Sequence, residues 1–313
     1  MMNKPAVPPK VSYLKKRASY MEFLMILPFI ILVCVFSYYP MYGWVYAFFD
    51  YKPPAPLSVD QFVGIKWFSV MIDTPVKIQQ LLSVVRNTFA MSGLHIGFSW
   101  LPMVFAIFLN EIRNRPFRKI VQTVTTLPNF ISWVLVYSIA YNFFNSTGMV
   151  NRLLTQLGVI DTPILFLQAS ENVWFTMWLW LTWKNLGWAA IMYLAAIAGI
   201  DREMYEAARV DGASRLQSIL HITIPGLLPT FFVLLLLNIA NILSNGLEQY
   251  YVFQNAFNKD YIQVLDLYVF NIAMGARSYS VATAISMVKS VISIVLLCSV
   301  NALSKAVRGE SLI

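Results

Sequence analysis

Charged residues are scarce in this sequence of 313 residues. Asp, Glu, Lys and Arg make up 12% of it, against 58% for hydrophobic residues, and an average globular chain carries about twice that share of charge. Cysteine is scarce as well: the chain has two, Cys34 and Cys298. Both lie within apolar runs, so we expect no disulfide framework. The shortage of charge excludes an ordinary soluble domain and predicts a membrane protein.

Catalytic motifs are missing too. The sequence has no G-x-x-x-x-G-K-[ST] segment, so we expect no ATP hydrolysis through a P-loop in this chain. It has no HExxH, no paired aspartates within apolar runs and no Ser/His/Asp arrangement. Its two histidines, His95 and His221, fall in an apolar run and in a polar connection, too far apart for a shared metal site. We expect neither an enzyme nor a bound metal or cofactor.

Long apolar runs are what the sequence has in place of charge. A helix needs about 20 apolar residues to cross the hydrocarbon core of a bilayer. Six stretches qualify: 22–49, 87–110, 118–143, 173–199, 226–247 and 281–303. They predict an all-α, polytopic membrane protein with six transmembrane helices. The first contains Pro28, Pro40 and Gly43, which predict a kink or a short re-entrant end. The fourth is rich in tryptophan and is the weakest by hydropathy.

The positive charges predict the orientation. Fourteen of the 23 Lys and Arg residues lie at the two ends of the chain and in the connections after the second and fourth spans, and seven are spread over the other connections. The positive-inside rule places the richer set in the cytoplasm. We expect cytoplasmic tails over 1–21 and 305–313 around a transmembrane domain over 22–304. No basic run is interleaved with exposed aromatics, so the net charge of +8 predicts no nucleic-acid partner.

The start of the chain imitates a signal peptide. Lys15, Lys16 and Arg17 precede the first apolar run. That run is too long for a cleaved hydrophobic region and lacks a small-x-small cleavage site, so we expect it to be retained as a span.

The polar connection over residues 200–225 is more elaborate than a simple linker. Asp201 is placed to cap a short helix, Gly212 permits a left-handed turn, and Ser214 starts a capping-box pattern. Pro225 is well placed to begin the next span. We expect two short helices that project from the membrane. Such a loop suits an amphipathic connector on the bilayer surface, or a docking element whose small residues let another protein approach closely.

This loop resembles the EAA motif of binding-protein-dependent ABC importer permeases. The resemblance rests on Glu206, Ala207, Ala208, Asp211, Gly212 and Ala213, followed by Ile222-Thr-Ile-Pro225 and Pro229. In that family the loop forms coupling helices that dock into a groove of an ATPase subunit. The resemblance implies that these residues, with Pro225, couple the chain to an ATPase. At His221 the family commonly has an aliphatic or aromatic residue, and we expect a polar residue at the interface.

Further segments are similar to the carbohydrate branch of that family, the polysaccharide and complex-oligosaccharide permeases often called LplB-like. They are Tyr39–Gly43, Leu109–Arg113, Leu127–Trp133, Trp183–Trp188, Tyr193-Leu-Ala-Ala and Gly246–Gln249. The resemblance implies a type I ABC importer permease fold in a prokaryotic cell membrane. It also implies a second permease subunit, two ATPase subunits that hold ATP and Mg²⁺, an extracytoplasmic sugar-binding lipoprotein and a saccharide substrate.

Polar side chains within spans mark a candidate substrate pathway, because they are costly in lipid unless they face protein or water. The fifth span carries Asn238, Asn241, Asn245 and Glu248 at steps of three and four, which predicts one helical face. Amide and carboxylate groups bond sugar hydroxyls, and aromatic rings cover apolar sugar faces. The third and fourth spans offer such groups at Asn129, Trp133, Tyr137 and Tyr141, and at Trp183, Lys184, Asn185 and Trp188.

Each of these features has a plainer explanation. Asparagines in spans often serve only as hydrogen bonds between helices, worth on the order of 1 kcal/mol, and aromatic stripes often only pack. Lys184 lies near the middle of its span, and we expect it inside the bundle, either paired with a carboxylate such as Glu248 or facing a cavity. Lys289 is expected to pack or to extend toward the interface.

Two other functions stay open on the residues. One is an ABC permease for a different solute, and the other is a self-sufficient secondary transporter or channel. The second predicts coupling carboxylates or an inverted repeat, and six spans with one central lysine offer little of either. We expect alternating access driven by the partner ATPases.

Overall fold

The computed structural model describes residues 10–168 and 170–308. Within them, β-pairing is limited to an isolated bridge between Phe49 and Phe62, so the all-α prediction is confirmed. The α-helices are α1 (Lys10–Val33), α2 (Lys66–Ser69), α3 (Pro75–Gly97), α4 (Leu101–Glu111), α5 (Arg115–Thr126), α6 (Trp133–Phe144), α7 (Met149–Gln156), α8 (Val173–Ala198), α9 (Arg202–Val210), α10 (Arg215–Ser218), α11 (Ile224–Ala240), α12 (Glu248–Phe253), α13 (Lys259–Ile262), α14 (Leu265–Phe270) and α15 (Tyr279–Arg308). Short 3-10 and π-helical segments are η1 (Cys34–Tyr38), η2 (Tyr39–Phe48), η3 (Val59–Gln61), η4 (Val70–Ile72), η5 (Leu127–Phe130), η6 (Ile219–Thr223) and η7 (Asn271–Gly275).

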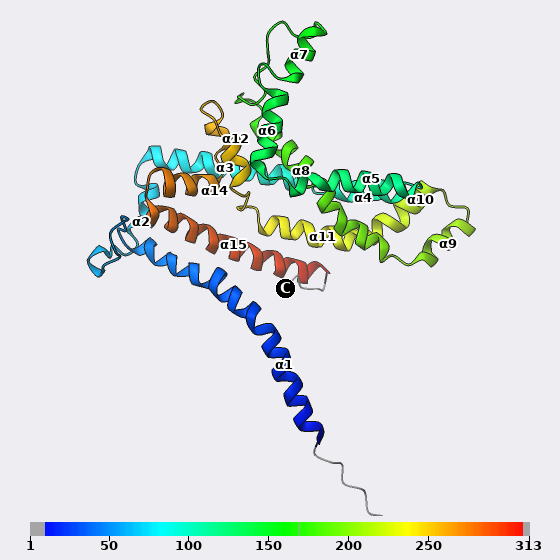
Figure 1. Ribbon diagram of the computed structural model, residues 1–313, viewed down its shortest axis with the longest axis horizontal. Helices are drawn as coiled ribbons and strands as arrows, with labels where there is room; N and C mark the ends of the chain where they lie inside the picture. Colours follow the sequence, from blue (N-terminus) through cyan, green and yellow to red (C-terminus); the bar gives the residue numbers. More distant parts are fainter. Residues whose placement is uncertain (1–9, 169, 309–313) are drawn as a thin grey trace, which may run out of the picture.

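Helix α8 is the centre of the bundle. It contacts α3, α4, α5 and α11, and these helices run along the long axis of the molecule (Figure 1). Helix α15 packs beside α11. Helices α9 and α10 lie together at one end, α2 and α14 lie toward the other, and α6 and α7 project from the middle (Figure 1). The chain therefore forms an elongated bundle with a side arm.

A glycine allows α5 to approach α8 closely. A Cβ atom at Gly187 would lie 2.3 Å from the carbonyl oxygen of Thr125, a distance that no side chain tolerates. Apolar clusters fill the spaces on either side. One gathers around Met177 and Phe253, and another joins Tyr193 of α8 to Leu227 of α11. Helix α8 thus holds both ends of the bundle together.

Four helices of the described chain are long and apolar enough to cross a membrane: Tyr20–Phe48, Pro75–Glu111, Arg215–Ala240 and Tyr279–Ala302. The bent pair Arg115–Phe130 and Trp133–Gln156 adds a fifth if it is one span. Helix α8 has 26 residues, about 39 Å at 1.5 Å per residue, but its tryptophans and a lysine lower its hydropathy. The predicted count of six spans is therefore not confirmed.

The third predicted span, over 118–143, is not one continuous helix. The helix from α5 through η5 ends at Phe130, and α6 starts at Trp133 in a direction 107° away. Ser132 restarts the helix, because its side chain accepts a hydrogen bond from the Leu135 amide. We call residues 127–133 the elbow.

The fifth span is also shifted. A continuous helix runs from Arg215 to Ala240, so α10 is joined to α11 through the π-helical turn η6 and is not a separate short helix. The predicted end near residue 247 is wrong, because Asn241 already leaves the helix and Gly246 takes a left-handed φ of +84°. The polar residues that follow Ala240 therefore do not continue the helix.

The loop between α8 and α11 follows the local signals in the sequence. Asp201 caps α9 by accepting a hydrogen bond from the Glu203 amide at 3.0 Å. Gly212 has a φ of +75°, which a residue with a Cβ rarely adopts. Ser214 forms the expected capping box with Gln217. The first short helix and the turn are thus confirmed.

The first segment is helical from Lys10 to Phe48 and changes from α to π at Cys34 and to 3-10 at Tyr39. Pro28 lies inside α1 without ending it. Part of the predicted N-terminal tail, from Lys10 on, therefore belongs to a helix. Residues 1–9 of that tail and 309–313 of the C-terminal tail lie outside the described residues.

Candidate functional site

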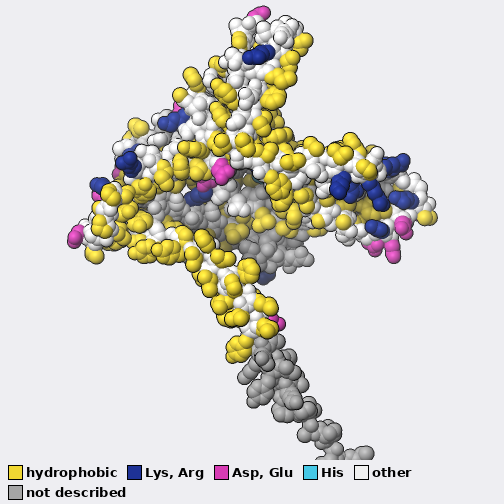
Figure 2. Space-filling model, in the orientation of Figure 1, with side chains coloured by type: hydrophobic (Ala, Val, Ile, Leu, Met, Phe, Trp, Pro, Cys, Tyr) yellow, Lys and Arg dark blue, Asp and Glu magenta, His cyan; other side chains and the backbone are white. Residues whose placement is uncertain are grey.

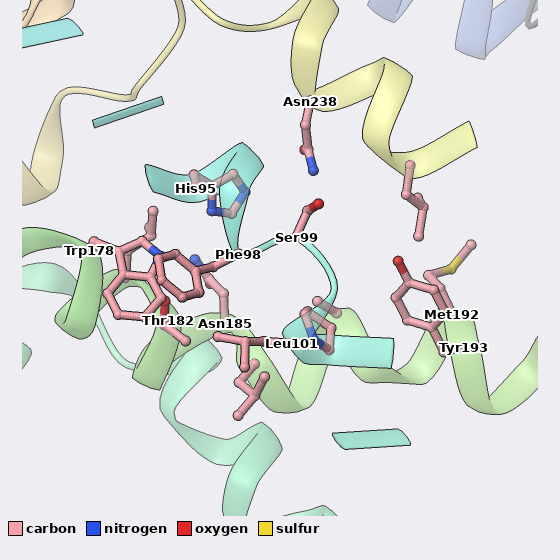
Figure 3. Close-up of a pocket in the computed structure, with 15 residues that line it drawn as sticks. His95, Phe98, Ser99, Leu101, Trp178, Thr182, Asn185, Met192, Tyr193 and Asn238 are labelled. Atoms are coloured by element: carbon pink, nitrogen blue, oxygen red, sulfur yellow. The ribbon is translucent and has the colours of Figure 1, made fainter. Parts of the chain in front are cut away.

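A cavity of about 170 Å³ lies between the α3–α4 break, α8 and α11 (Figure 3). We call it the α8 pocket. Its polar lining consists of His95, Ser99, Thr182, Asn185, Tyr193 and Asn238. The other lining residues are mostly apolar and include Trp178, Leu186 and Leu234. The pocket thus combines hydroxyl, amide and imidazole groups with apolar walls.

The break between α3 and α4 brings His95 and Ser99 to the pocket. Pro102 lies in the first turn of α4, where its missing amide hydrogen breaks no helical hydrogen bond. The ring of Phe98 lies 4.5 Å from that of Trp178, centroid to centroid. This contact holds the break against α8.

Asn185 connects the α8 pocket to the elbow. Its Oδ1 accepts a hydrogen bond from Nδ2 of Asn129 at 2.9 Å. Both residues are half-buried. Of the residues predicted in the fourth span, Asn185 lines the pocket, whereas Trp188 is half exposed and packs edge-on against Phe130 at 5.7 Å between ring centroids.

Lys184 is buried, with 7% of its surface exposed, which agrees with its predicted place inside the bundle. Its ammonium group donates to the carbonyl oxygens of Pro128 at 3.2 Å and Asn129 at 2.7 Å. It also lies 5.5 Å from the centre of the Trp133 ring. The ion pairs of the described residues do not include a Lys184–Glu248 pair. The predicted carboxylate partner is replaced by the elbow backbone.

The predicted polar face of the fifth span is wrong as a single face. Asn238 lines the α8 pocket. Asn241 is exposed, and its side chain donates back to the Leu237 carbonyl at 2.9 Å. Asn245 donates to the Ser92 hydroxyl at 2.8 Å, and Glu248 begins α12 as an exposed residue. The helix ends at Ala240, so the spacing of three and four no longer aligns these side chains.

The predicted aromatic stripe lies away from the α8 pocket. The rings of Trp133 and Tyr137 pack edge-on against Phe253, at 6.5 and 5.0 Å between centroids. Tyr137 and Tyr141 line a separate cavity of about 80 Å³ together with Asn255. For Trp133 the packing explanation fits best, while the two tyrosines border a small cavity with mixed polar and apolar walls.

His95, Ser99, Thr182 and Tyr193 were missed as candidates from the sequence. His95 and Ser99 are four residues apart on either side of a helix end, and the Pro102 that follows could have indicated the break. Tyr193 carries no separate signal, since a tyrosine in an apolar run usually packs. Among the described residues no three His, Cys, Asp or Glu side chains gather in a way that could hold a metal ion.

The residues of the EAA-like loop lie at the end of the molecule where α9 and α10 meet. Glu206, Ala207, Asp211 and Gly212 are exposed, Ala208 and Ala213 are half-buried, and Pro225 is exposed in the first turn of α11. Figure 2 shows Lys and Arg side chains gathered at this end, with Asp and Glu beside them. His221 is exposed, and its Nδ1 lies 3.0 Å from the Gln217 carbonyl oxygen. The loop surface is accessible to a partner, and its coupling role stays a prediction.

An ion pair between α14 and α15 was not predicted. Lys289 donates to Oδ1 of Asp266, and the two side chains are 18% and 20% exposed. Oδ2 of Asp266 accepts a hydrogen bond from the Gly246 amide at 3.0 Å. The expectation that Lys289 only packs or reaches the interface is therefore wrong. An aspartate inside the apolar segment Leu265–Phe270 was the available signal.

Comparisons with known proteins agree with this architecture. Residues 99–309 match the family described as "Binding-protein-dependent transport system inner membrane component". Protein LplB of Bacillus subtilis (strain 168) is 34% identical over 93% of this chain and 90% of its own length. The polygalacturonan/rhamnogalacturonan transport system permease protein YteP of the same organism is 35% identical over 93% of this chain and 89% of its own.

Solved structures give the same result for the fold. One is the crystal structure of a bacterial ABC transporter involved in the import of the acidic polysaccharide alginate. It matches with a TM-score of 0.81 and 31% identity over 95% of this chain and 99% of that chain. Another, of a bacterial alginate ABC transporter in complex with alginate pentasaccharide-bound periplasmic protein, gives 0.82 and 30% over 96% and 99%. With the ABC permease fold and the family match both in place, this chain belongs to the inner-membrane components of binding-protein-dependent transport systems.

Proposed function

We propose that this chain is the membrane-spanning permease subunit of an ATP-driven ABC importer for oligo- or polysaccharides. The proposal rests on one observation, that a single helix connects the EAA-like loop to the α8 pocket. The segment Arg215–Ala240 starts at the EAA-like loop and places Asn238 at the α8 pocket. This helix runs without interruption from the loop to the pocket, so a displacement of the loop reaches the pocket along one helix.

The α8 pocket suits a hydroxylated solute. Its amides and hydroxyls are groups that bond sugar hydroxyls, and its apolar walls, with Trp178, suit the faces of a sugar ring. The relative named for polygalacturonan and rhamnogalacturonan transport, and the two structures of alginate transporters, support a saccharide.

The proposed partners are those of the family. The family of binding-protein-dependent permeases supports two partner ATPase subunits, which hold ATP and Mg²⁺ and drive alternating access, and this sequence has no P-loop of its own. A second permease subunit completes the pathway, and an extracytoplasmic sugar-binding protein delivers the substrate, as the structure with a periplasmic protein supports. The distribution of Lys and Arg supports cytoplasmic termini and a cytoplasmic EAA-like loop.

Reconstitution tests the transport activity. The chain, its partner permease, the ATPases and the binding protein are placed in proteoliposomes, and uptake of labelled oligogalacturonides, alginate oligosaccharides and malto-oligosaccharides is measured. We expect ATP-dependent uptake of at least one of them. Uptake by this chain without the ATPases would contradict the proposal, as would ATP-dependent uptake confined to solutes other than saccharides.

The pocket assignment is tested by alanine substitution. A lost hydrogen bond to substrate is worth about 0.5–1.5 kcal/mol, so we expect Asn238→Ala or Asn185→Ala to lower uptake at limiting substrate by about 2- to 12-fold. Asn241→Ala is the matched control, because that side chain is exposed and bonds to its own helix. Equal effects at positions 238 and 241 would rule the assignment out.

The coupling loop is tested by co-purification. Glu206→Lys reverses an exposed charge on α9, and we expect the tagged permease to lose its ATPase subunits. Asp161→Lys makes the same change at an exposed residue outside the EAA-like loop and should leave the complex intact. Retention of the ATPases by the Glu206 variant would remove the support for this docking face.

A further inference from the structure

We propose that the hydrogen bond between Tyr205 and Thr223 is the contact through which the EAA-like loop moves α11. The two residues are positioning residues for coupling, and the proposal rests on the ATP-driven function inferred above. The Tyr205 hydroxyl and Thr223 Oγ1 are 3.0 Å apart. Tyr205 lies on α9, and Thr223 is the last residue of the π-helical turn η6.

The bond is not a surface contact, because Thr223 is buried. Its side chain is buried, with 3% exposed. A threonine within a helix commonly bonds a carbonyl of its own preceding turn, as Thr125 does with Val121 at 2.8 Å. The hydroxyl of Thr223 instead bonds a different helix. Removing the tyrosine hydroxyl would leave a buried polar group without this partner. The bond therefore favours one position of α9 relative to α11.

The turn η6 is the point at which the helix that contains α11 can bend. Within it the Ile224 amide donates to the Ile219 carbonyl, five residues back. Pro225 follows, and proline has no amide hydrogen and its ring crowds the carbonyl four residues back. A widened turn relieves that crowding. Single π-helical turns of this kind mark functional sites and bends in helices.

A second contact holds the loop beside the same turn. A Cβ atom at Gly226 would lie 2.7 Å from Cδ1 of Ile200, so the start of the loop and the start of α11 are in close approach. Ile224, also at this end, packs against the apolar cluster that contains Leu227 and Tyr193. Tyr193 lines the α8 pocket. Packed side chains therefore continue from the loop contact to the pocket.

Helix α11 completes the connection. From Thr223 to Asn238 the rise is about 22 Å at 1.5 Å per residue, and Leu234 and Asn238 both line the α8 pocket. A tilt of the helix at η6 thus changes the pocket wall. The hydrogen bond sets whether α9 and this helix move together.

The test follows the pocket during the nucleotide cycle. Met192 lines the pocket and is 54% exposed. In the full complex, Cys34 and Cys298 are replaced by serine, the partners' cysteines are removed, and Met192→Cys is labelled with a small maleimide. For the otherwise unchanged complex we expect the labelling rate to differ at least threefold between the nucleotide-free and ATP–vanadate states. Tyr205→Phe and Thr223→Val should each abolish that difference while ATP hydrolysis and vanadate trapping continue.

Matched controls separate the bond from general damage. Tyr251→Phe and Thr230→Val delete hydroxyls that make no hydrogen bond within the described residues, and both should keep the nucleotide-dependent labelling. Thr223→Ser restores the hydroxyl and should restore the response, even if Thr223→Val assembles poorly. The double variant should behave like either single variant.

The outcomes distinguish the two proposals. Nucleotide-dependent labelling that persists in both Tyr205→Phe and Thr223→Val overturns the role of this bond. An unchanged complex that shows neither nucleotide-dependent labelling nor ATP-driven uptake overturns the proposed function itself.

Discussion

Lys184 shows how a single charge is held inside this bundle. A buried ammonium group usually needs a carboxylate, because an unpaired charge is costly away from water. Here two carbonyl oxygens at the end of η5 accept its hydrogen bonds. The C-terminal end of a helical segment carries partial negative charge and free carbonyls, and the Trp133 ring adds a cation–π contact. The carbonyl groups of the elbow therefore stabilise the charge in place of a counter-ion.

Removing the Lys184 charge should destabilise the elbow. Lys184→Met keeps the length of the side chain and leaves buried carbonyls unpaired, so we expect a loss of about 1–3 kcal/mol in stability. Lys119→Met, at an exposed site, should change it by less than about 0.5 kcal/mol. Equilibrium unfolding in detergent measures both. Equal stabilities of the two variants would contradict the proposed support of the elbow.

Helix breaks are the elements that shape the site. The α3–α4 break brings His95 and Ser99 to the pocket, the elbow turns α6 out of the bundle, and η6 widens the helix before α11. Backbone groups freed at a break within lipid need partners, because water is absent there. Helix α8 supplies them at the elbow through Lys184 and supplies Trp178 at the first break. Two of the three breaks therefore lie where α8 supports them, and the third, η6, is bonded by Tyr205 of α9.

Close packing of α5 on α8 depends on Gly187. Alanine there would place its Cβ atom 2.7 Å or less from backbone atoms of Thr125 and Thr126. We expect Gly187→Ala to destabilise the chain by about 1–3 kcal/mol through forced separation of the helices. Gly93→Ala lies in α3 with open space around its Cβ, and should be neutral or stabilising by up to about 1 kcal/mol. Thermal unfolding in detergent compares them, and an equally stable Gly187 variant would argue against the close approach.

Across the whole molecule, Asp266 links parts that are far apart in the sequence. Its two oxygens bond Lys289 of α15 and the Gly246 amide after α11. Helices α11, α14 and α15 are thereby tied at one end, opposite the EAA-like loop (Figure 1). That end is held by a half-buried ion pair, whereas the loop end is held by the Tyr205–Thr223 hydrogen bond, by packing and by a more exposed pair at 3.8 Å between Arg215 and Glu111.

A double-mutant cycle measures how much the ion pair between Asp266 and Lys289 contributes to the free energy of unfolding. Breaking a buried pair by removing one partner costs about 3–5 kcal/mol, and the partial exposure of this pair places it near the lower figure. We expect Lys289→Met alone to be more destabilising than Asp266→Leu with Lys289→Met, because the double variant leaves no unpaired charge. Additive losses in unfolding free energy would show that the pair contributes nothing specific.

Local signals in the sequence predicted much of this structure. Caps and turns at Asp201, Gly212 and Ser214 are local, so their chemistry decides them without tertiary contacts. The elbow and the end of α11 at Ala240 were missed because the long apolar runs were read as continuous helices, although Pro128, Ser132 and Gly246 are breaking or turn residues within them. Lys184 was placed correctly inside the bundle, but its partners are carbonyl groups, and every residue carries one. Asn238 was separated from Asn241 and Asn245 by a helix end that hydropathy does not register.

The partners of Lys184 also bear on how the chain enters the membrane. A lysine at the centre of a helix raises the cost of insertion by the translocon by about 2.5–3.5 kcal/mol, and α8 is already poor in hydropathy. Pro128 and Asn129 precede Lys184 in the chain, so the ribosome makes the acceptors before the charge. The acceptors of the Lys184 charge are therefore already made when α8 is synthesised, so the order of synthesis favours the burial of this lysine.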